Sequence, residues 1–251
     1  MRKNIQFIFV LLLLLSISAQ AADTVLIVVT SHDQMGETDE PTGFWLSELT
    51  HPYFVIKDAE YDIVIASIKG GKAPIDPRSV DTTDQINQRF LNEPKLMKLV
   101  NNSKKLSDIN PNGLSAVLFS GGHGAMWDFP GNADVNDVSK TIYESGGVVG
   151  AVCHGPAALS DIKLTNGEYL INGKQFAAFT NEEEIMVELD KVVPFMLEDR
   201  LIKRGGKIVS AKPWQSNAVI DNRVVTGQNP QSAQRVGELI VEALKTRDSD
   251  K

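Results

Sequence analysis

The chain has 251 residues and a mass of 27.5 kDa, which suits one large α/β domain or two small ones. Its 42% hydrophobic and 23% charged residues are typical of a globular protein and exclude a disordered or collagen-like chain. The formal net charge of −7 argues against a broad basic surface for nucleic acid or an anionic membrane. A single cysteine excludes an internal disulfide framework, an iron–sulfur cluster and any zinc site that needs several cysteines.

The amino-terminal segment has the pattern of a secretory signal peptide. Two basic residues precede an apolar run at residues 7–15, and a small-residue Ala-Gln-Ala pattern ends at Ala21. The run is too short to span a bilayer, which needs roughly 20 residues. We therefore expect residues 1–21 to be removed after export, with an uncleaved anchor or a lipoprotein signal as the alternative. The mature domain, residues 22–251, is then periplasmic or secreted and has no membrane attachment.

The first half of the domain alternates strands and helices. Residues 24–30 form a nearly continuous β-branched run that predicts a strand buried on both faces. Apolar spacing predicts a helix over residues 42–59, although Pro52 should break or kink it. A second buried strand is expected at residues 62–67, and the polar segment 84–106 is expected to be a helical insertion at the side.

The second half continues the same alternation. Strands are expected at residues 116–120 and 148–152, with a helix around residues 135–143 between them. The rest of the chain predicts short strands at 176–179 and 207–210, a helix at 195–204, a hairpin across 218–226 and a final helix from Asn229. Strands that alternate with helices predict a single α/β domain, with a mostly parallel sheet and helices on both faces.

The only cysteine, Cys153, follows the fourth predicted strand directly. Small residues at Gly150, Ala151 and Gly155 allow a tight turn before a helix that begins near Pro156. Strand, sharp turn and helix make a nucleophile elbow, here with a thiol in place of a serine. The helix N-terminus would favour the thiolate, so we expect a depressed pKa and ready oxidation. The alternative is an inert cysteine buried at a strand end.

Residues 151–158, Ala-Val-Cys-His-Gly-Pro-Ala-Ala, resemble the nucleophile turn of the ThiJ/PfpI superfamily, which shares its fold with class I glutamine amidotransferases. Further matching segments follow one another along the chain, at residues 42–52, 70–76, 120–124, 128–130, 178–182 and 224–230. The motifs are most similar to the heat-shock-chaperone branch, whose members are described as glutathione-independent glyoxalases (glyoxalase III) and some as chaperones or deglycases. The resemblance implies a flavodoxin-like, class I glutamine amidotransferase-like fold and a cysteine nucleophile. Export departs from the usual cytoplasmic location of that branch.

The resemblance also implies two acidic groups at the site. It places Glu48 beside the cysteine, where a protonated carboxyl can donate a hydrogen bond to the thiolate and move a proton between substrate carbons. An exposed helix glutamate is the alternative for Glu48. A later acidic residue is implied to orient His154, and the spacing favours Glu184, with Glu182 and Glu183 as alternatives. Adjacency in sequence does not by itself make His154 the base for Cys153.

The remaining candidates line the predicted pocket. The backbone amides of Gly122 and His154 are expected to form an oxyanion site. His123 either lines the pocket or satisfies its own loop, and Trp214 either walls the pocket or packs in the core. The other histidines show no spacing typical of metal ligands, so we expect no metal and no cofactor.

These residues favour an enzyme that converts methylglyoxal to lactate without glutathione, through a thiol adduct. The alternatives are a cysteine peptidase or amidase at the same site, and a holdase chaperone with a redox-sensing thiol. A glutaminase triad would need a histidine after Cys153, and the four histidines are His32, His51, His123 and His154. The expected partners are a small dicarbonyl substrate, unfolded protein clients and a second copy of the chain in a homodimer, with no nucleic acid.

Overall fold

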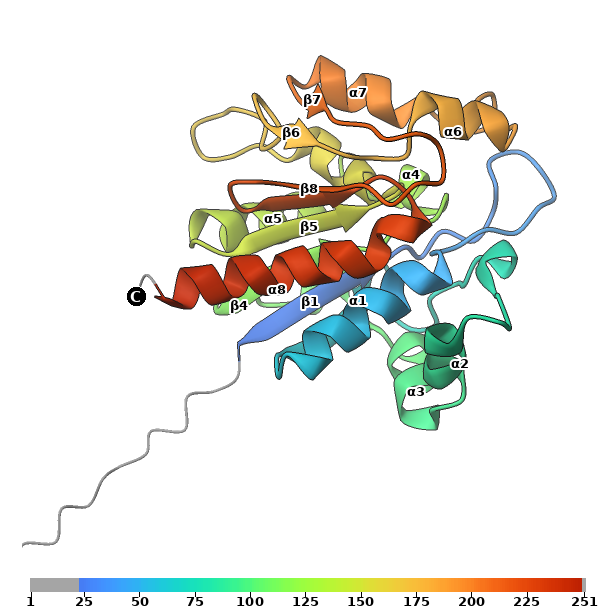
Figure 1. The fold of residues 1–251 in the computed structure, drawn as a ribbon, viewed down its shortest axis with the longest axis horizontal. Coiled ribbons are helices and arrows are strands. Elements are labelled where there is room, and N and C mark those ends of the chain that lie inside the picture. The colour runs from blue at the N-terminus through green and yellow to red at the C-terminus, as the bar shows by residue number, and fades with distance from the viewer. Residues whose placement is uncertain (1–22, 250–251) are drawn as a thin grey trace, which may run out of the picture.

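The computed structural model describes residues 23–249, so the predicted signal peptide lies outside the described residues. The main sheet has seven strands, ordered β3-β2-β1-β4-β5-β9-β8 (Figure 1). The strands are β1 (Thr24–Val29), β2 (Asp62–Ser67), β3 (Lys104–Lys105), β4 (Leu114–Phe119), β5 (Val148–Val152), β8 (Ala218–Asp221) and β9 (Val224–Gly227). Neighbours pair in parallel except β8 and β9, which form the predicted hairpin. The short strands β6 (Gln175–Phe176) and β7 (Lys207–Ile208) pair separately.

Helices cover both faces of the main sheet, as predicted. In Figure 1, α1 and α8 lie in front of the sheet and α5 lies behind it. The helices are α1 (Leu46–Asp58), α2 (Gln85–Leu91), α3 (Pro94–Asn101), α4 (Ala125–Asp128), α5 (Ala133–Glu144), α6 (Asn181–Met186), α7 (Leu197–Lys203) and α8 (Ala233–Ser249). Successive residues of β1 join different cores: Val25, Ile27 and Val29 pack with α1 and α8, whereas Leu26 and Val28 pack on the α5 side. This two-sided burial explains the continuous apolar run of the strand.

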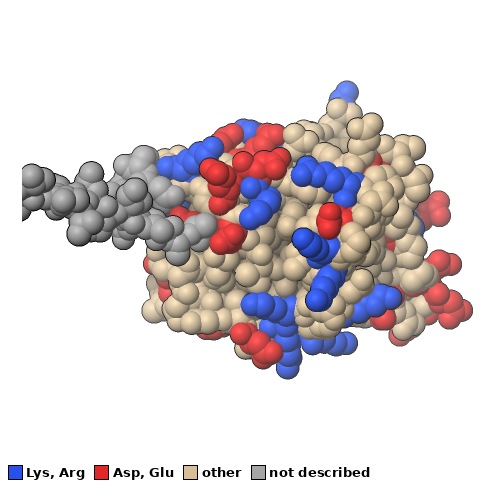
Figure 2. All heavy atoms as spheres, turned by 90° about the horizontal axis from the view of Figure 1, so that it is seen from below, with Lys and Arg blue, Asp and Glu red and all other residues tan. Residues whose placement is uncertain are grey.

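The insertion at residues 84–106 is helical, as expected: it consists of α2 and α3, followed by the edge strand β3. Asp84 accepts hydrogen bonds from the first amides of α2 and caps it, and Pro94 opens α3 as its first residue. None of the described helices is long and apolar enough to cross a bilayer. Acidic and basic side chains both occur across the face shown in Figure 2.

Helix α1 runs through Pro52 without ending, so of the expected break or kink the break does not occur. Proline has no N–H, and the carbonyl of Glu48, four residues earlier, therefore lacks its helical donor. The hydroxyl of Ser120 donates to that carbonyl at 3.0 Å and replaces the missing amide. Because Ser120 follows β4 directly, this bond ties the first turn of α1 to the carboxyl end of the sheet. Ligands of open α/β sheets bind at this edge.

Candidate active site

Cys153 lies at the carboxyl end of β5 in a left-handed backbone conformation, with φ of 59°. This region costs a non-glycine residue about 1–3 kcal/mol and is typical of functional turns. The 3₁₀ helix Gly155–Asp161 follows at once. A Cβ on Gly155 would overlap the carbonyl oxygen of Phe119 on the neighbouring strand, so the turn needs glycine there. The local geometry is the nucleophile elbow that the sequence predicts.

His154 lies between the thiol and a carboxylate. Its Nδ1 is 3.3 Å from Sγ of Cys153, and its Nε2 is 2.7 Å from Oε2 of Glu184. Adjacent side chains normally diverge, but the left-handed conformation of Cys153 brings these two together. All three side chains are at least 96% buried. The structure thus forms a Cys-His-Glu chain and places Glu184 on His154.

The two neighbouring glutamates have other surroundings. Glu182 is exposed. Glu183 is fully buried and makes a capping box with Thr180 at the start of α6. Its Oε1 also accepts hydrogen bonds from the Trp214 amide at 3.0 Å and from Asn229 Nδ2 at 2.8 Å. Glu183 therefore fixes the loop that carries Trp214 and makes no contact of this kind with His154.

Glu48, on the first turn of α1, is fully buried beside the thiol. Neither carboxyl oxygen has a hydrogen-bond partner of regular geometry among the described residues. Burial raises the pKa of Glu48 well above its usual range, and the nearby thiol of Cys153 and amide of Gly121 offset this only in part. Burial therefore favours the protonated carboxyl of Glu48, which can donate a hydrogen bond.

The depressed pKa expected for Cys153 is not what its surroundings produce. Burial raises the pKa of the thiol well above its usual range, and the carboxyl group of Glu48 raises it further. The Gly122 amide acts in the opposite direction, but more weakly. The short helix after the elbow does not overcome the loss of water. A thiolate forms here only when Glu48 holds the proton, because two adjacent buried anions repel strongly.

His123 extends the chain beyond Glu184. Its Nε2 is 2.9 Å from Oε1 of Glu184, and Arg78 donates to its Nδ1 at 3.2 Å. Burial, followed by the charge of His154, lowers the pKa of His123 to about 4, so the ring is neutral and donates to Glu184. Arg78 is itself held by two hydrogen bonds to the buried carboxylate of Asp76. His123 thus lines the pocket, and both of its ring nitrogens have hydrogen-bond partners.

The carboxylate of Glu184 bridges two imidazoles. Burial acts to raise its pKa, but the charge of His154 and hydrogen bonds from both rings hold the pKa far below its usual range. His123, His154 and Glu184 each offer an atom within 4.8 Å of the others, so this trio could hold a metal ion. Hydrogen bonds among the three already satisfy these atoms, and the geometry is complete without one.

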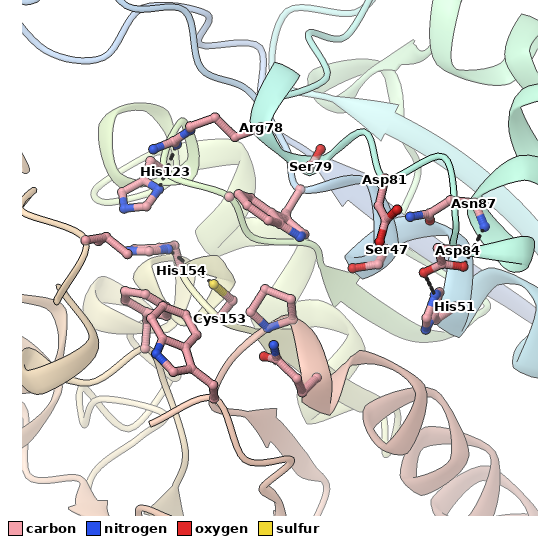
Figure 3. Close-up of a pocket in the computed structure, with 17 residues that line it drawn as sticks. Ser47, His51, Arg78, Ser79, Asp81, Asp84, Asn87, His123, Cys153 and His154 are labelled. Atoms are coloured by element: carbon pink, nitrogen blue, oxygen red, sulfur yellow. Dashed lines mark hydrogen bonds and ion pairs between the residues drawn. The ribbon is translucent and has the colours of Figure 1, made fainter. Parts of the chain in front are cut away.

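The thiol opens into a cavity of about 640 Å³, shown in Figure 3. Trp45, Phe179 and Trp214 supply apolar walls. The rings of Phe179 and Trp214 also pack edge-on, with their centroids 5.7 Å apart. Trp214 therefore both walls the pocket and packs against a neighbouring side chain, the two roles that the sequence left open. Gly122 lies in the wall with φ of 96°, and a Cβ there would lie 2.5 Å from the Trp45 nitrogen. Only glycine lets this amide approach the sulfur.

Sequence reasoning did not find Arg78, Asp76 or the bond from His123 to Glu184. The partners of His123 are 45 and 61 residues away along the chain, so no local pattern joins them. Arg78 ends a loop whose Gly and Pro content was visible, but nothing in that composition indicates where its guanidinium points.

An α/β sheet with a cysteine elbow, a buried acid beside the thiol and a His-Glu pair defines a class of cysteine-dependent enzyme folds. The chain belongs to the DJ-1/PfpI family, whose model matches residues 41–243. It is 32% identical to Glyoxalase 3 of Candida albicans over 238 residues, covering 88% of this chain and 98% of that one. The solved structure of glyoxalase III from Candida albicans superposes with a TM-score of 0.81 at 32% identity, covering 88% and 97% of the two chains. Rapid Encystment Protein 24 KDa of Francisella tularensis is 48% identical with a TM-score of 0.86, covering 88% and 99%.

Proposed function

We propose that the protein is a glutathione-independent glyoxalase that converts methylglyoxal and water to lactate, with Cys153 as the nucleophile. The observation that carries this proposal is the pair formed by Cys153 and Glu48. A fully buried carboxyl, whose protonated form burial favours, lies beside a thiol at the end of a solvent-connected cavity. The similarity to glyoxalase III of Candida albicans supports the same reaction.

The reaction needs only groups that this site holds. The thiolate of Cys153 adds to the aldehyde carbon, and the proton of Glu48 passes to the new oxyanion, giving a hemithioacetal. The Glu48 carboxylate then removes the hydrogen of that carbon as a proton and returns it to the adjacent carbon through an enediol. The product of this internal oxidation and reduction is a thioester of lactate. Amides at Gly122 and His154 stabilise the oxyanions.

Water completes the cycle. His154, oriented by Glu184, takes a proton from water, which attacks the thioester carbon and releases the thiolate and lactic acid, which leaves as lactate and a proton. The proton on His154 then returns to Glu48, which restores the starting thiolate and carboxylic acid. Glu184 acts as a positioning residue here, because its carboxylate touches His154 and not Cys153. One water is consumed and no external oxidant or reductant takes part.

The test is lactate formation from methylglyoxal by purified protein, with a chelator present and without glutathione. Cys153→Ala should abolish turnover. Glu184→Gln should lower kcat by about tenfold or more through misorientation of His154, and Glu182→Gln is the matched control on the same turn of α6, with no loss expected. Full activity of Cys153→Ala would reject the proposal and leave the chaperone alternative.

We also propose that the protein acts outside the cytoplasm after cleavage at Ala21. The basic start, the apolar run at residues 7–15 and the Ala-Gln-Ala pattern support export. Amino-terminal sequencing of the periplasmic protein should begin at Ala22. Cytoplasmic protein that begins at Met1 would contradict it.

A further inference from the structure

The cavity is far larger than methylglyoxal requires. A volume of about 640 Å³ falls within the roughly 300–1,000 Å³ that hold drug-sized ligands, whereas methylglyoxal has a three-carbon skeleton. Figure 3 shows the cavity lined by two groups of side chains. Cys153 and His154 lie on one side, and a second group lies away from them. This second group, the polar end, consists of Ser47, His51, Asp81, Asp84 and Asn87.

Asn87 gives the strongest sign that the polar end binds a ligand. The residue is only 1% exposed, and its Oδ1 accepts a hydrogen bond from Thr50 at 2.5 Å. Its Nδ2 donates to no described residue, and the side chain lines the cavity. In Figure 3 the amide nitrogen points toward Asp81 and Ser47 across open space. Because Asn87 lines the cavity, its Nδ2 can donate there to a ligand or to water.

The neighbours of Asn87 offer further unused groups of both kinds. Asp81 is an exposed carboxylate that accepts hydrogen bonds from the amide and hydroxyl of Thr83 on Oδ1, and the Asp84 amide also contributes to lowering its pKa. A carboxylate has about four acceptor positions, so it can still accept a hydrogen bond from a ligand. Ser47, 9% exposed, lines the cavity beside Asn87 and Asp81, and its hydroxyl makes no hydrogen bond to another described residue. Asp84 is committed at both oxygens, through Oδ1 to the amides that open α2 and through Oδ2 to His51 at 2.8 Å. The free groups are thus one amide donor, one carboxylate acceptor and one hydroxyl.

This combination fits hydroxyl groups. A hydroxyl both donates and accepts, so a chain of hydroxyls satisfies Asn87 as a donor and Asp81 as an acceptor at the same time. Two carboxylates at this end, Asp81 and Asp84, disfavour a phosphate or carboxylate on the ligand. An apolar chain would leave the same groups unpaired.

We infer that the natural substrate is an α-oxoaldehyde that carries an uncharged polyhydroxylated chain, of the kind formed when a sugar loses water. This inference rests on the proposed function. The reacting end binds at Cys153, and the hydroxylated chain occupies the polar end. The reaction consumes one water and turns R–CO–CHO into R–CHOH–COOH, with the C1 hydrogen transferred to C2 and the chain unchanged.

The test compares 3-deoxyglucosone with 2-oxohexanal, which has the same six carbons and lacks the three chain hydroxyls. Wild-type protein, Asp81→Asn and Ser47→Ala are each assayed with both compounds and with methylglyoxal. Each variant should lower the kcat/KM ratio of 3-deoxyglucosone to 2-oxohexanal by about three- to tenfold, the usual effect of one hydrogen bond. Because each ratio is compared with that of the wild type, the small free-aldehyde fraction of the sugar compound cancels.

Two readouts separate a binding role from a loss of fold. Turnover of methylglyoxal, which is too short to reach both ends, should change less than about twofold in both variants. Asp58→Asn makes the same change of charge on an exposed aspartate of α1 outside the cavity, and it should leave the ratio unchanged. Ratios that stay at the wild-type value in Asp81→Asn and Ser47→Ala, with methylglyoxal still turned over, would overturn the inference and leave the proposed function standing. No Cys153-dependent turnover of any of the three compounds would reject both.

Discussion

Replacing Glu48 by glutamine should make the Cys153 thiol more acidic, although it removes the proton shuttle. In the wild type a thiolate competes with the adjacent carboxyl for one proton, and burial raises the pKa of both groups. Two unit charges about 4 Å apart repel by about 4 kcal/mol at an effective dielectric constant near 20. Glutamine removes this charge and keeps an N–H donor toward the sulfur, so the pKa of Cys153 should fall.

Alkylation by iodoacetamide, followed from pH 5 to 11, measures the change directly. The midpoint should move to lower pH in Glu48→Gln, while methylglyoxal conversion falls by about 10²- to 10⁴-fold, the usual contribution of a general acid–base group. Mass spectrometry should still detect a methylglyoxal adduct on Cys153 in this variant. A midpoint that stays in place or moves to higher pH would refute the shared-proton argument, and a loss of conversion below about tenfold would remove Glu48 from the shuttle.

Three further predictions concern stability. Because burial raises the pKa of Glu48, the native state keeps a proton that the unfolded chain releases above its usual pKa of 4.5, so this group destabilises the fold as pH rises. In urea unfolding, the free energy of unfolding of Glu48→Gln relative to the wild type should therefore be higher at pH 8 than at pH 4. An equal difference at both pH values would contradict this. The free energy of unfolding of Cys153→Gly should be about 1 kcal/mol higher than that of Cys153→Ala, because glycine adopts φ of 59° without strain. Equal stability of the two variants would show that this turn holds no backbone strain. Ser120→Ala should cost about 1–3 kcal/mol by orphaning the Glu48 carbonyl, and adding Pro52→Ala should recover most of it; a double variant no more stable than Ser120→Ala would reject this account of α1.

The order of strands and helices could be predicted because it depends on local patterns. Strands buried on both faces, such as β1 and β5, are continuous apolar runs, and their limits in the structure match the predicted ones to within one residue. Of the break or kink expected at Pro52, the break does not occur, for a tertiary reason. The proline rule holds for a helix alone, whereas here Ser120, 72 residues from Glu48, supplies the missing donor.

The candidate site was predictable in its parts and not in its contacts. Successive residues of a helix point about 100° apart, so only one of three adjacent glutamates can face His154. Spacing selected Glu184, but nothing local showed that Glu183 is fully buried against the Trp214 loop. The left-handed conformation of Cys153 was equally hidden, because a non-glycine residue gives no sign of positive φ.

The same burial that contradicts the expected low pKa gives a physical reason for a lone thiol in a protein that we propose to be exported. An exposed thiolate of low pKa oxidises readily, whereas Cys153 is 3% exposed and burial raises the pKa of its thiol. A thiolate of higher pKa is also the stronger nucleophile once it forms. Because Glu48 holds a proton of its own, the thiolate forms with no second negative charge beside it. Burial therefore protects the thiol from oxidants in solvent, while the thiolate can still attack an aldehyde that enters the cavity. Both properties depend on the burial of Cys153 and Glu48 side by side.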